Sequence, residues 1–260
     1  MDLKFVKRVG IAAAYKGGNI LRSHYGKINK IDKKGAIDLV TEADTESEKA
    51  IIETIKKLFP DHTILAEESG WNIGEANHQW FVDPLDGTTN FAHELGLFSI
   101  SIAFALNGET VFGIVLIPET GEMFTALKDS GAELNGRPIS VSNSKTVSDS
   151  LLITGFPYDL MDALNPLMTR FANCLKASQG VRRLGSAAID LCFVACGRFD
   201  AFWEQNLKPW DTAAGEFIAR EAGAMITDFS NKPFSVNKKE ILATNGNIHN
   251  EMLSLLQIKS

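Results

Sequence analysis

Residues 83–91 read Asp-Pro-Leu-Asp-Gly-Thr-Thr-Asn-Phe, and they constrain the fold of this chain more than any other stretch. Residues 79–82, the run Gln-Trp-Phe-Val, predict a short buried strand that delivers Asp83 and Asp86 to its carboxyl end. Pro84 has a fixed φ and disfavours helix at the preceding aspartate, which makes the corner rigid. The Gly-Thr-Thr-Asn that follows is typical of the entry into a helix. The sequence therefore predicts a strand, a corner with two acids, and a helix.

A corner of this kind suits a cation placed beside an anion. The carboxylate oxygens of Asp83 and Asp86 are hard ligands of the type that Mg²⁺ and Mn²⁺ prefer. The backbone N–H groups of Gly87, Thr88 and Thr89 would be unpaired at a helix start, where free donors and the helix dipole bind phosphate. We therefore predict a divalent metal next to a phosphate group.

Length and composition exclude several classes of protein. The 260 residues suffice for one large domain or two packed lobes with a substantial core. A net charge of −6 argues against broad affinity for nucleic acid, and no apolar run approaches the length of a membrane span. Cys174, Cys192 and Cys196 lack metal-binding spacing and are odd in number, which favours reduced core thiols. We expect a cytoplasmic protein.

The apolar pattern predicts an α+β front half and an α/β back half. The front half is expected to hold helices over 3–25 and 45–59, strands over 98–106 and 111–117 joined by a turn at Asn107-Gly108, a strand over 122–127 and a turn at Asn135-Gly136. The back half is expected to hold helices near 160–178, 187–196 and 212–222 and strands near 151–155, 199–203, 224–228 and 241–244. The Ser-rich stretch 141–150 is the candidate junction, so we place an N-terminal lobe at 1–145 and a C-terminal lobe at 146–260.

Further acidic residues lie next to predicted strands and helices. Glu67 and Glu68 come directly after the strand-like run 63–66, so one of them can point toward the corner. Asp44 and Asp211 each stand at the start of a predicted helix, where an aspartate commonly serves as N-cap. Taken one at a time, each aspartate is expected to be an N-cap rather than a metal ligand, and Glu67-Glu68 is expected to be a solvated pair.

Taken together, the motifs resemble a known family. They are Asp-Leu-Val-Thr-Glu-Ala-Asp from 38, Glu-Glu-Ser from 67, the corner motif from 83, and Trp-Asp-Thr-Ala-Ala-Gly from 210. In this order they resemble the inositol monophosphatase family, which belongs with the fructose-1,6-bisphosphatases to the lithium-sensitive, Mg²⁺-dependent phosphatases. The resemblance spans residues 38 to about 228. It implies a layered αβαβα sugar-phosphatase fold and hydrolysis of a phosphomonoester.

The resemblance also implies a set of metal ligands. Glu67 would hold a first ion together with Asp83 and the backbone carbonyl of Leu85. Asp83 would bridge to a second ion, which Asp86 and Asp211 would also hold. A third, weaker ion near Glu67 is expected in this family. The cofactor is therefore expected to be two or three Mg²⁺ ions, with Mn²⁺ as a possible substitute.

Catalytic roles follow from the same resemblance. Thr88 would orient the attacking water, and Asp44 would accept a hydrogen bond from its hydroxyl group. Glu67 would take part in catalysis through the metal. The amides of Gly87 and Thr88 would bind the phosphate, and Lys33 occupies roughly the place of a lysine that approaches the site in relatives.

The chemistry of the acids leads to the same expectation without the family. Four or five carboxylates in one cleft repel each other, and burial would force some of them to take up protons unless cations compensate. Divalent ions remove that conflict, activate water, and stabilise the attacking and leaving oxygens of an in-line displacement. No catalytic Cys or Ser motif accompanies the acids, which argues for direct attack by water.

Substrate recognition is expected to come mostly from the back half. In relatives the turn 184–188 lines the sugar side of the pocket, although a plain helix start is an equal interpretation, and a glutamate at the place of Glu204 grips ring hydroxyls. Arg182 and Arg183 would meet a second phosphate or lie on the surface, and we favour the surface. The residues expected to contact substrate are Asp86, Gly87, Thr88, Gly185, Ser186, Ala187, Glu204 and Asp211.

Three functions remain open at this point. The first is a phosphomonoesterase for inositol monophosphate and related polyol or sugar phosphates, which Glu204 favours. The second is a sister enzyme for fructose 1,6-bisphosphate, adenosine 3′,5′-bisphosphate or NADP(H). The third is a regulatory role through the transcription machinery, known for some bacterial relatives, either alone or beside catalysis. We expect a small-molecule phosphate ester as substrate, no membrane or direct nucleic-acid partner, and a homodimer, which is common among relatives.

Overall fold

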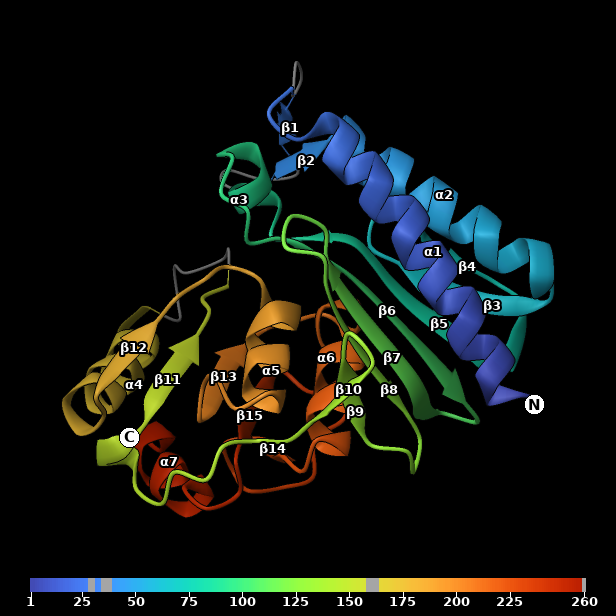
Figure 1. Ribbon diagram of the computed structural model, residues 1–260. Helices are drawn as coiled ribbons and strands as arrows, with labels where there is room; N and C mark the ends of the chain where they lie inside the picture. The colour runs from blue at the N-terminus through green and yellow to red at the C-terminus, as the bar shows by residue number, and fades with distance from the viewer. Residues whose placement is uncertain (28–30, 34–38, 158–163, 259–260) are drawn as a thin grey trace.

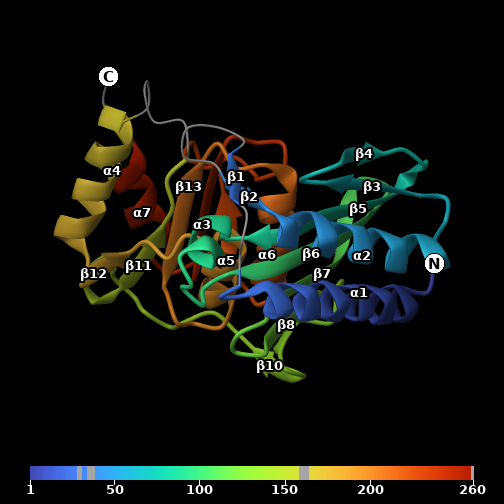
Figure 2. The ribbon, with the colours of Figure 1, turned by 90° about the horizontal axis from the view of Figure 1, so that it is seen from above.

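The computed structural model describes residues 1–27, 31–33, 39–157 and 164–258, with the backbone alone for 31–33, 39 and 40. Its layers are two helices, an eight-stranded sheet, two helices, a five-stranded sheet and two further helices (Figure 1 and Figure 2). This is the αβαβα arrangement that the motifs imply. Among the described residues, no helix is long and apolar enough to span a membrane.

The first sheet has the strand order β10-β9-β8-β7-β6-β5-β3-β4. Its strands are β3 (His62–Ala66), β4 (Gly70–Asn72), β5 (Glu75–Asp86), β6 (Ser99–Leu106), β7 (Glu109–Ile117), β8 (Glu122–Leu127), β9 (Ala132–Leu134) and β10 (Arg137–Ile139). Its outer face is covered by α1 (Leu3–His24) and α2 (Glu42–Leu58). A separate pair, β1 (Ile31–Lys33) with β2 (Leu39–Thr41), precedes α2, and the short helix α3 (Thr88–Ala92) follows β5.

The second sheet has the order β12-β11-β13-β15-β14 and mixes parallel and antiparallel pairs. Its strands are β11 (Leu151–Thr154), β12 (Gly180–Arg182), β13 (Ala201–Gln205), β14 (Met225–Thr227) and β15 (Glu240–Thr244). The inner helices are α5 (Ala187–Ala195) and α6 (Pro209–Glu221), and the outer helices are α4 (Leu164–Ala177) and α7 (His249–Leu256). The turn η1 (Val147–Asp149) precedes β11.

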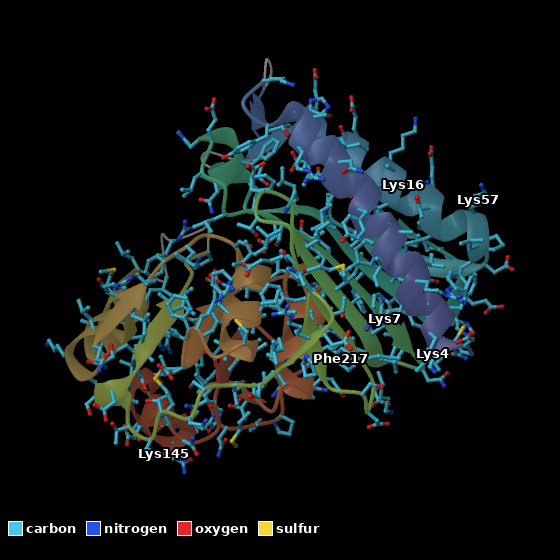
Figure 3. The ribbon with its side chains drawn as sticks, viewed as in Figure 1. Lys4, Lys7, Lys16, Lys57, Lys145 and Phe217 are labelled. Atoms are coloured by element: carbon cyan, nitrogen blue, oxygen red, sulfur yellow. The ribbon has the colours of Figure 1, made fainter. Side chains whose placement is uncertain are left out.

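Alternation along the central strands explains why the first sheet is covered on both faces. Trp80 and Val82 of β5 pack toward α1 and α2, whereas Phe81 between them packs toward α5 and α6. Complete burial of a large apolar side chain such as Trp80 contributes about 1.5–3 kcal/mol. Figure 3 shows the opposite arrangement on the outer helices, where Lys16 and Lys57 point into solvent, while Phe217 of α6 lies inside.

The close approach of α6 to the first sheet depends on a glycine. A Cβ atom built on Gly113 of β7 would lie 2.9 Å from the carbonyl oxygen of Ala214. Helix α6 presents the small residues Ala213 and Ala214 to the sheet at this point. The absence of a side chain therefore sets the distance of α6 from the sheet, and with it the depth at which the first turn of α6 enters the site.

Most of the predicted elements are confirmed, with errors at their ends. The hairpin of β6 and β7 turns at Asn107-Gly108 as expected, and α1 agrees with the prediction within one residue at its C-terminus. Helices α2 and α6 each begin three residues earlier than predicted, and the prediction missed the short strands β1, β2, β4 and β12 and the helix α7. The start of the helix expected near 160–178 lies outside the described residues. The division into lobes at residue 145 stays a prediction.

Candidate active site

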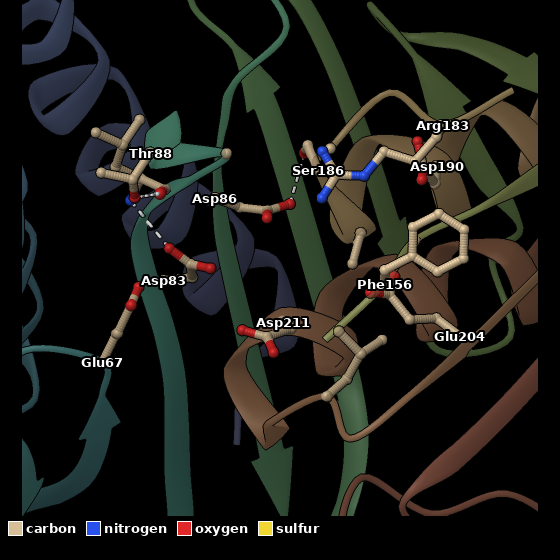
Figure 4. Close-up of a pocket in the computed structure, with 16 residues that line it drawn as sticks. Glu67, Asp83, Asp86, Thr88, Phe156, Arg183, Ser186, Asp190, Glu204 and Asp211 are labelled. Atoms are coloured by element: carbon tan, nitrogen blue, oxygen red, sulfur yellow. Dashed lines mark hydrogen bonds between the residues drawn. The ribbon is translucent and has the colours of Figure 1, made fainter. Parts of the chain in front are cut away.

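The acidic residues of the predicted corner open onto a cavity of about 100 Å³ between the carboxyl end of β5 and the first turns of α5 and α6. Figure 4 shows Glu67, Asp83, Asp86 and Asp211 gathered on one side of it, and Asp190 and Glu204 on the other, beside Phe156. The cavity is lined by Glu67, Asp83, Leu85, Asp86, Gly87, Thr88, Gly155, Phe156, Arg183, Gly185, Ser186, Ala187, Asp190, Glu204, Leu207 and Asp211. Every residue predicted as a metal ligand or a substrate contact lines this cavity.

The corner itself is built as a bulge at the end of β5. The prediction ended the strand before the acids, but β5 continues to Asp86, with an irregular register between Asp83 and Asp86. Because a bulge leaves residues outside the hydrogen-bond ladder, it accommodates Pro84, which has no N–H to donate. The amide of Leu85 donates to Asp83 Oδ1 at 3.0 Å, so the corner holds its own first carboxylate in place.

Gly87 connects the corner to α3 in a conformation that favours glycine. Its φ is +96°, and a Cβ atom at this position would lie 3.0 Å from the carbonyl oxygen of Leu97 and 3.3 Å from that of Gly185. The predicted helix entry is therefore confirmed: α3 begins at Thr88. The helix has five residues, so it serves mainly to place Thr88 in the cavity wall.

The side chain of Thr88 lies between two acceptors. Its Oγ1 is 3.3 Å from Asp44 Oδ1 and 3.1 Å from the carbonyl oxygen of Leu85. Asp44 is fully buried, and its Oδ2 accepts hydrogen bonds from the amide and the hydroxyl group of Thr41 at 2.8 and 2.5 Å. The structure therefore brings Asp44 to Thr88, as the resemblance implied, and holds its carboxylate from the opposite side.

Asp44 and Asp211 were expected as helix N-caps, and neither is one. Thr41 is the N-cap of α2 and Lys208 is the N-cap of α6, while Asp44 and Asp211 each stand at N3. From N3, Asp44 accepts from the amide of Thr41, and Asp211 accepts from the amide of Lys208 at 2.7 Å. Each aspartate thus satisfies a helix start with one oxygen and remains available to the site with the rest of its carboxylate.

Asp86 connects β5 to the second half of the chain. Its Oδ2 accepts from the Ser186 hydroxyl group at 2.6 Å and from the Ala188 amide at 2.8 Å. Ser186 is the N-cap of α5 and is 2 % exposed. The interpretation of residues 184–188 as a plain helix start is therefore incomplete, because this turn both starts α5 and fixes a carboxylate of the corner.

Crowding in the cavity raises the pKa values of its acids. Burial is the largest cause in each case. It raises the pKa of Asp86 to about 6 and that of Glu204 to about 8, the latter with help from the charges of Asp211 and Asp86. Burial also raises the pKa values of Asp83 and Asp211, and Glu67 and Asp86 add to both shifts. Negative charge in this cavity is therefore costly without a cation.

The donor set fits a hard divalent cation. Glu67, Asp83, Asp86 and Asp211 supply carboxylate oxygens only, which is the ligand type of Mg²⁺. Within the described part of the chain, no three His, Cys, Asp or Glu side chains converge closely enough to enclose one ion in the present rotamers. The fit therefore rests on the chemistry of the four acids and on the raised pKa values of Asp83, Asp86 and Asp211. Lys33 lies in β1, and its side chain is outside the described residues.

Sequence reasoning missed four residues that line the cavity: Gly155, Phe156, Asp190 and Leu207. Asp190 is the single charged residue in α5, and the other eight residues of this helix are apolar. A lone acid in so apolar a helix is the sequence feature that could have identified it. Gly155 and Phe156 follow β11 and carry no sequence signal of their own. Arg183 was expected at the surface; it is exposed, but it also lines the cavity.

Comparison with known proteins agrees with this geometry. The model of the inositol monophosphatase family matches residues 2–259. The inositol-1-monophosphatase of Synechocystis sp. is 45% identical over 98% of this chain and 90% of its own. The Nus factor SuhB of Pasteurella multocida is 40% identical over 96% of this chain and 94% of its own.

The fold is also found among solved structures. The crystal structure of the extragenic suppressor protein suhB from Bartonella henselae superimposes with a TM-score of 0.94, at 38% identity, over 98% of this chain and 99% of that one. Likeness of sequence and of structure therefore extends over nearly the whole chain. The chain belongs to the inositol monophosphatase family, whose enzymes are phosphoric monoester hydrolases.

Proposed function

We propose that this protein is a Mg²⁺-dependent phosphomonoesterase that hydrolyses inositol monophosphate and related polyol phosphates. The observation that carries the proposal is the convergence of Glu67, Asp83, Asp86 and Asp211 on one cavity beside the Thr88–Asp44 pair. Burial raises the pKa values of three of these acids, Asp83, Asp86 and Asp211, so their charges need compensation, and a phosphate ester brings no positive charge of its own.

One ion would be held by Glu67, Asp83 and the Leu85 carbonyl. A second ion would be held by Asp83, Asp86 and Asp211, and a third, weaker ion would bind near Glu67. Mn²⁺ would substitute for Mg²⁺, since both take oxygen ligands. When bound, the ions supply the activation of water and the neutralisation of charge that direct hydrolysis of a phosphate ester requires.

The chain itself contributes orientation. Thr88 Oγ1 can donate to Asp44, which leaves its lone pairs to accept a hydrogen bond from a water molecule and so aim that water at the phosphorus atom. The amides of Gly87 and Thr88 would hold the phosphate oxygens. Glu204, Ser186 and the neighbouring backbone of Gly185 and Ala187 would contact the alcohol.

Phosphate release from a panel of esters tests the proposed function. With Mg²⁺ present, inositol 1-phosphate, fructose 1,6-bisphosphate, adenosine 3′,5′-bisphosphate and NADP should be compared at the level of kcat/KM. We expect the highest value for the inositol ester, because the alcohol side of the cavity presents carboxylates that accept hydrogen bonds from hydroxyl groups. A highest value for a bisphosphate would assign the chain to a sister activity, and no release from any ester would refute the proposal.

The role proposed for Thr88 can be tested separately from metal binding. Replacing Thr88 by Val keeps its volume but removes Oγ1, so kcat should fall about 100-fold while KM changes little. Thr88→Ser is the matched control, since it keeps the hydroxyl group and should retain most of kcat. Equal kcat values in the Val and Ser variants would contradict a role in orienting water.

A second function is supported by the name of a relative. The Nus factor SuhB of Pasteurella multocida shares 40% identity with this chain, which favours an additional regulatory role through the transcription machinery. Family membership also supports inhibition by lithium and assembly as a homodimer. Co-purification of RNA polymerase subunits with the tagged chain tests the regulatory role. Inhibition of phosphate release by LiCl tests lithium sensitivity, and light scattering tests the homodimer.

A further inference from the structure

We propose that Asp190 selects the alcohol that this site releases: its buried carboxylate accepts hydrogen bonds from hydroxyl groups of the substrate and repels a second phosphate group. The inference rests on the proposed phosphomonoesterase function and identifies the class of substrate, a polyol monophosphate rather than a bisphosphate.

The first observation is that Asp190 lacks a partner. It lies in the first turn of α5, is 1 % exposed, and lines the cavity. Neither Oδ1 nor Oδ2 has a hydrogen-bond partner among the described residues. A buried carboxylate without partners is costly, so such groups are rare unless a ligand or ion satisfies them. Asp190 differs in this respect from Asp86, whose Oδ2 accepts two hydrogen bonds from α5 and its N-cap.

The second observation is the position of Glu204 at the same end of the cavity. Glu204 ends the buried part of β13 and is 7 % exposed. A Cβ atom built on Gly155 would lie 2.1 Å from Glu204 Oε2, so the Glu204 carboxylate occupies the space that any other residue at 155 would fill. Figure 4 shows Asp190 and Glu204 together beside Phe156, away from the acids of the corner.

The charges around Asp190 explain what this end of the cavity accepts. Glu204 and Asp86 are its acidic neighbours, and Arg183 is its basic neighbour. Arg183 is exposed and hydrogen-bonds to neither oxygen of Asp190, so it leaves the acceptors open. Hydroxyl groups of a polyol are neutral donors that satisfy these acceptors. A second phosphate would bring negative charge and acceptor oxygens but no donors toward two acidic side chains, so it would leave the acceptors of Asp190 unsatisfied.

A purely structural role for Asp190 would require partners inside the protein. Glu216 of α6 provides the comparison, since it is 3 % exposed and its Oε2 also lacks a partner among the described residues. Its other carboxylate oxygen binds Arg220, and it does not line the cavity. Glu216→Gln is therefore a matched control, in which a buried acid loses its charge outside the site.

The experiment compares wild type, Asp190→Asn and Glu216→Gln on three esters with Mg²⁺ present. The esters are inositol 1-phosphate, cyclohexyl phosphate, which has the same ring without hydroxyl groups, and fructose 1,6-bisphosphate. We expect Asp190→Asn to lower kcat/KM for inositol 1-phosphate about 10- to 100-fold, mostly through KM, since each hydrogen bond to a charged acceptor contributes this much. Activity on cyclohexyl phosphate should change less than about twofold, and activity on the bisphosphate should stay constant or rise.

The outcomes separate the possible failures. Equal losses on all three esters in Asp190→Asn, or unchanged activity on inositol 1-phosphate, would overturn the role of Asp190. A change of the ester ratio in Glu216→Gln would overturn it too, because any buried charge would then act alike. Asp190→Asn should also melt no lower than wild type, since it removes a buried charge without partners. If wild type releases phosphate from none of the esters, the proposed function itself fails.

Discussion

Replacement of Asp86 by Asn is expected to lower kcat about 1,000-fold. Asp86 lies at the corner of β5 and is proposed to hold one ion, so loss of its charge weakens the shell at the reacting phosphate. The fold should survive, because the side-chain oxygen of Asn can accept the hydrogen bonds from Ser186 and Ala188 that Asp86 Oδ2 accepts. Steady-state kinetics with saturating Mg²⁺ measure the effect.

Asp61→Asn serves as the control for this substitution. Asp61 lies in an exposed turn before β3, outside the cavity, so its variant should show wild-type kinetics. The melting temperature of Asp86→Asn without Mg²⁺ should equal or exceed that of wild type, because the burial that raises the pKa of Asp86 makes its charge unfavourable. A kcat within a few-fold of wild type would remove Asp86 from the proposed metal shell.

Chelation of divalent ions is expected to abolish phosphate release, and added Mg²⁺ should restore it. The same ions should stabilise the folded protein, since they neutralise acids whose pKa values are raised by burial and by each other. At a Mg²⁺ concentration 100 times Kd, binding contributes about 2.7 kcal/mol, which corresponds to a rise in melting temperature of about 5 °C for a chain of this size. Scanning calorimetry of the chelated protein with and without Mg²⁺ measures this shift independently of activity.

The stabilisation should depend on the acids of the corner. In Asp86→Asn the rise in melting temperature with Mg²⁺ should be much smaller, whereas Asp61→Asn should show the full rise. NaCl at matched ionic strength controls for screening of charge. Full activity in the presence of EDTA, or the same thermal shift in wild type and Asp86→Asn, would contradict metal binding at this site.

The backbone conformation of the corner could be predicted because it depends on residues that are adjacent in the sequence. Pro84, Gly87 and the run of apolar residues before Asp83 act through their own backbone preferences, and the structure confirms the helix entry at Thr88. The end of β5 was predicted too early, since a bulge lets the strand continue through a proline, and its register depends on pairing with β6.

The starts of α2 and α6 were predicted too late for a related reason. An aspartate at a helix start reads as N-cap when only propensity is considered. Both aspartates stand at N3 instead: α2 has a capping box with Thr41 at the N-cap, and in α6 Asp211 accepts from the amide of the N-cap residue Lys208. The assignment matters for function, because each carboxylate at N3 is tied to the backbone while Asp211 lines the cavity and Asp44 accepts from Thr88.

The sequence by itself determined the family, the layered fold and the set of acids, because spaced motifs and local backbone preferences carry that information. Only the tertiary structure decided how Asp86 is held by α5, where Asp190 faces and how Gly155 makes room for Glu204. These relations join residues more than 45 positions apart in the chain, through the packing of α5 between two sheets. Their physical cause is burial: what a carboxylate can bind depends on which groups surround it after water has been excluded.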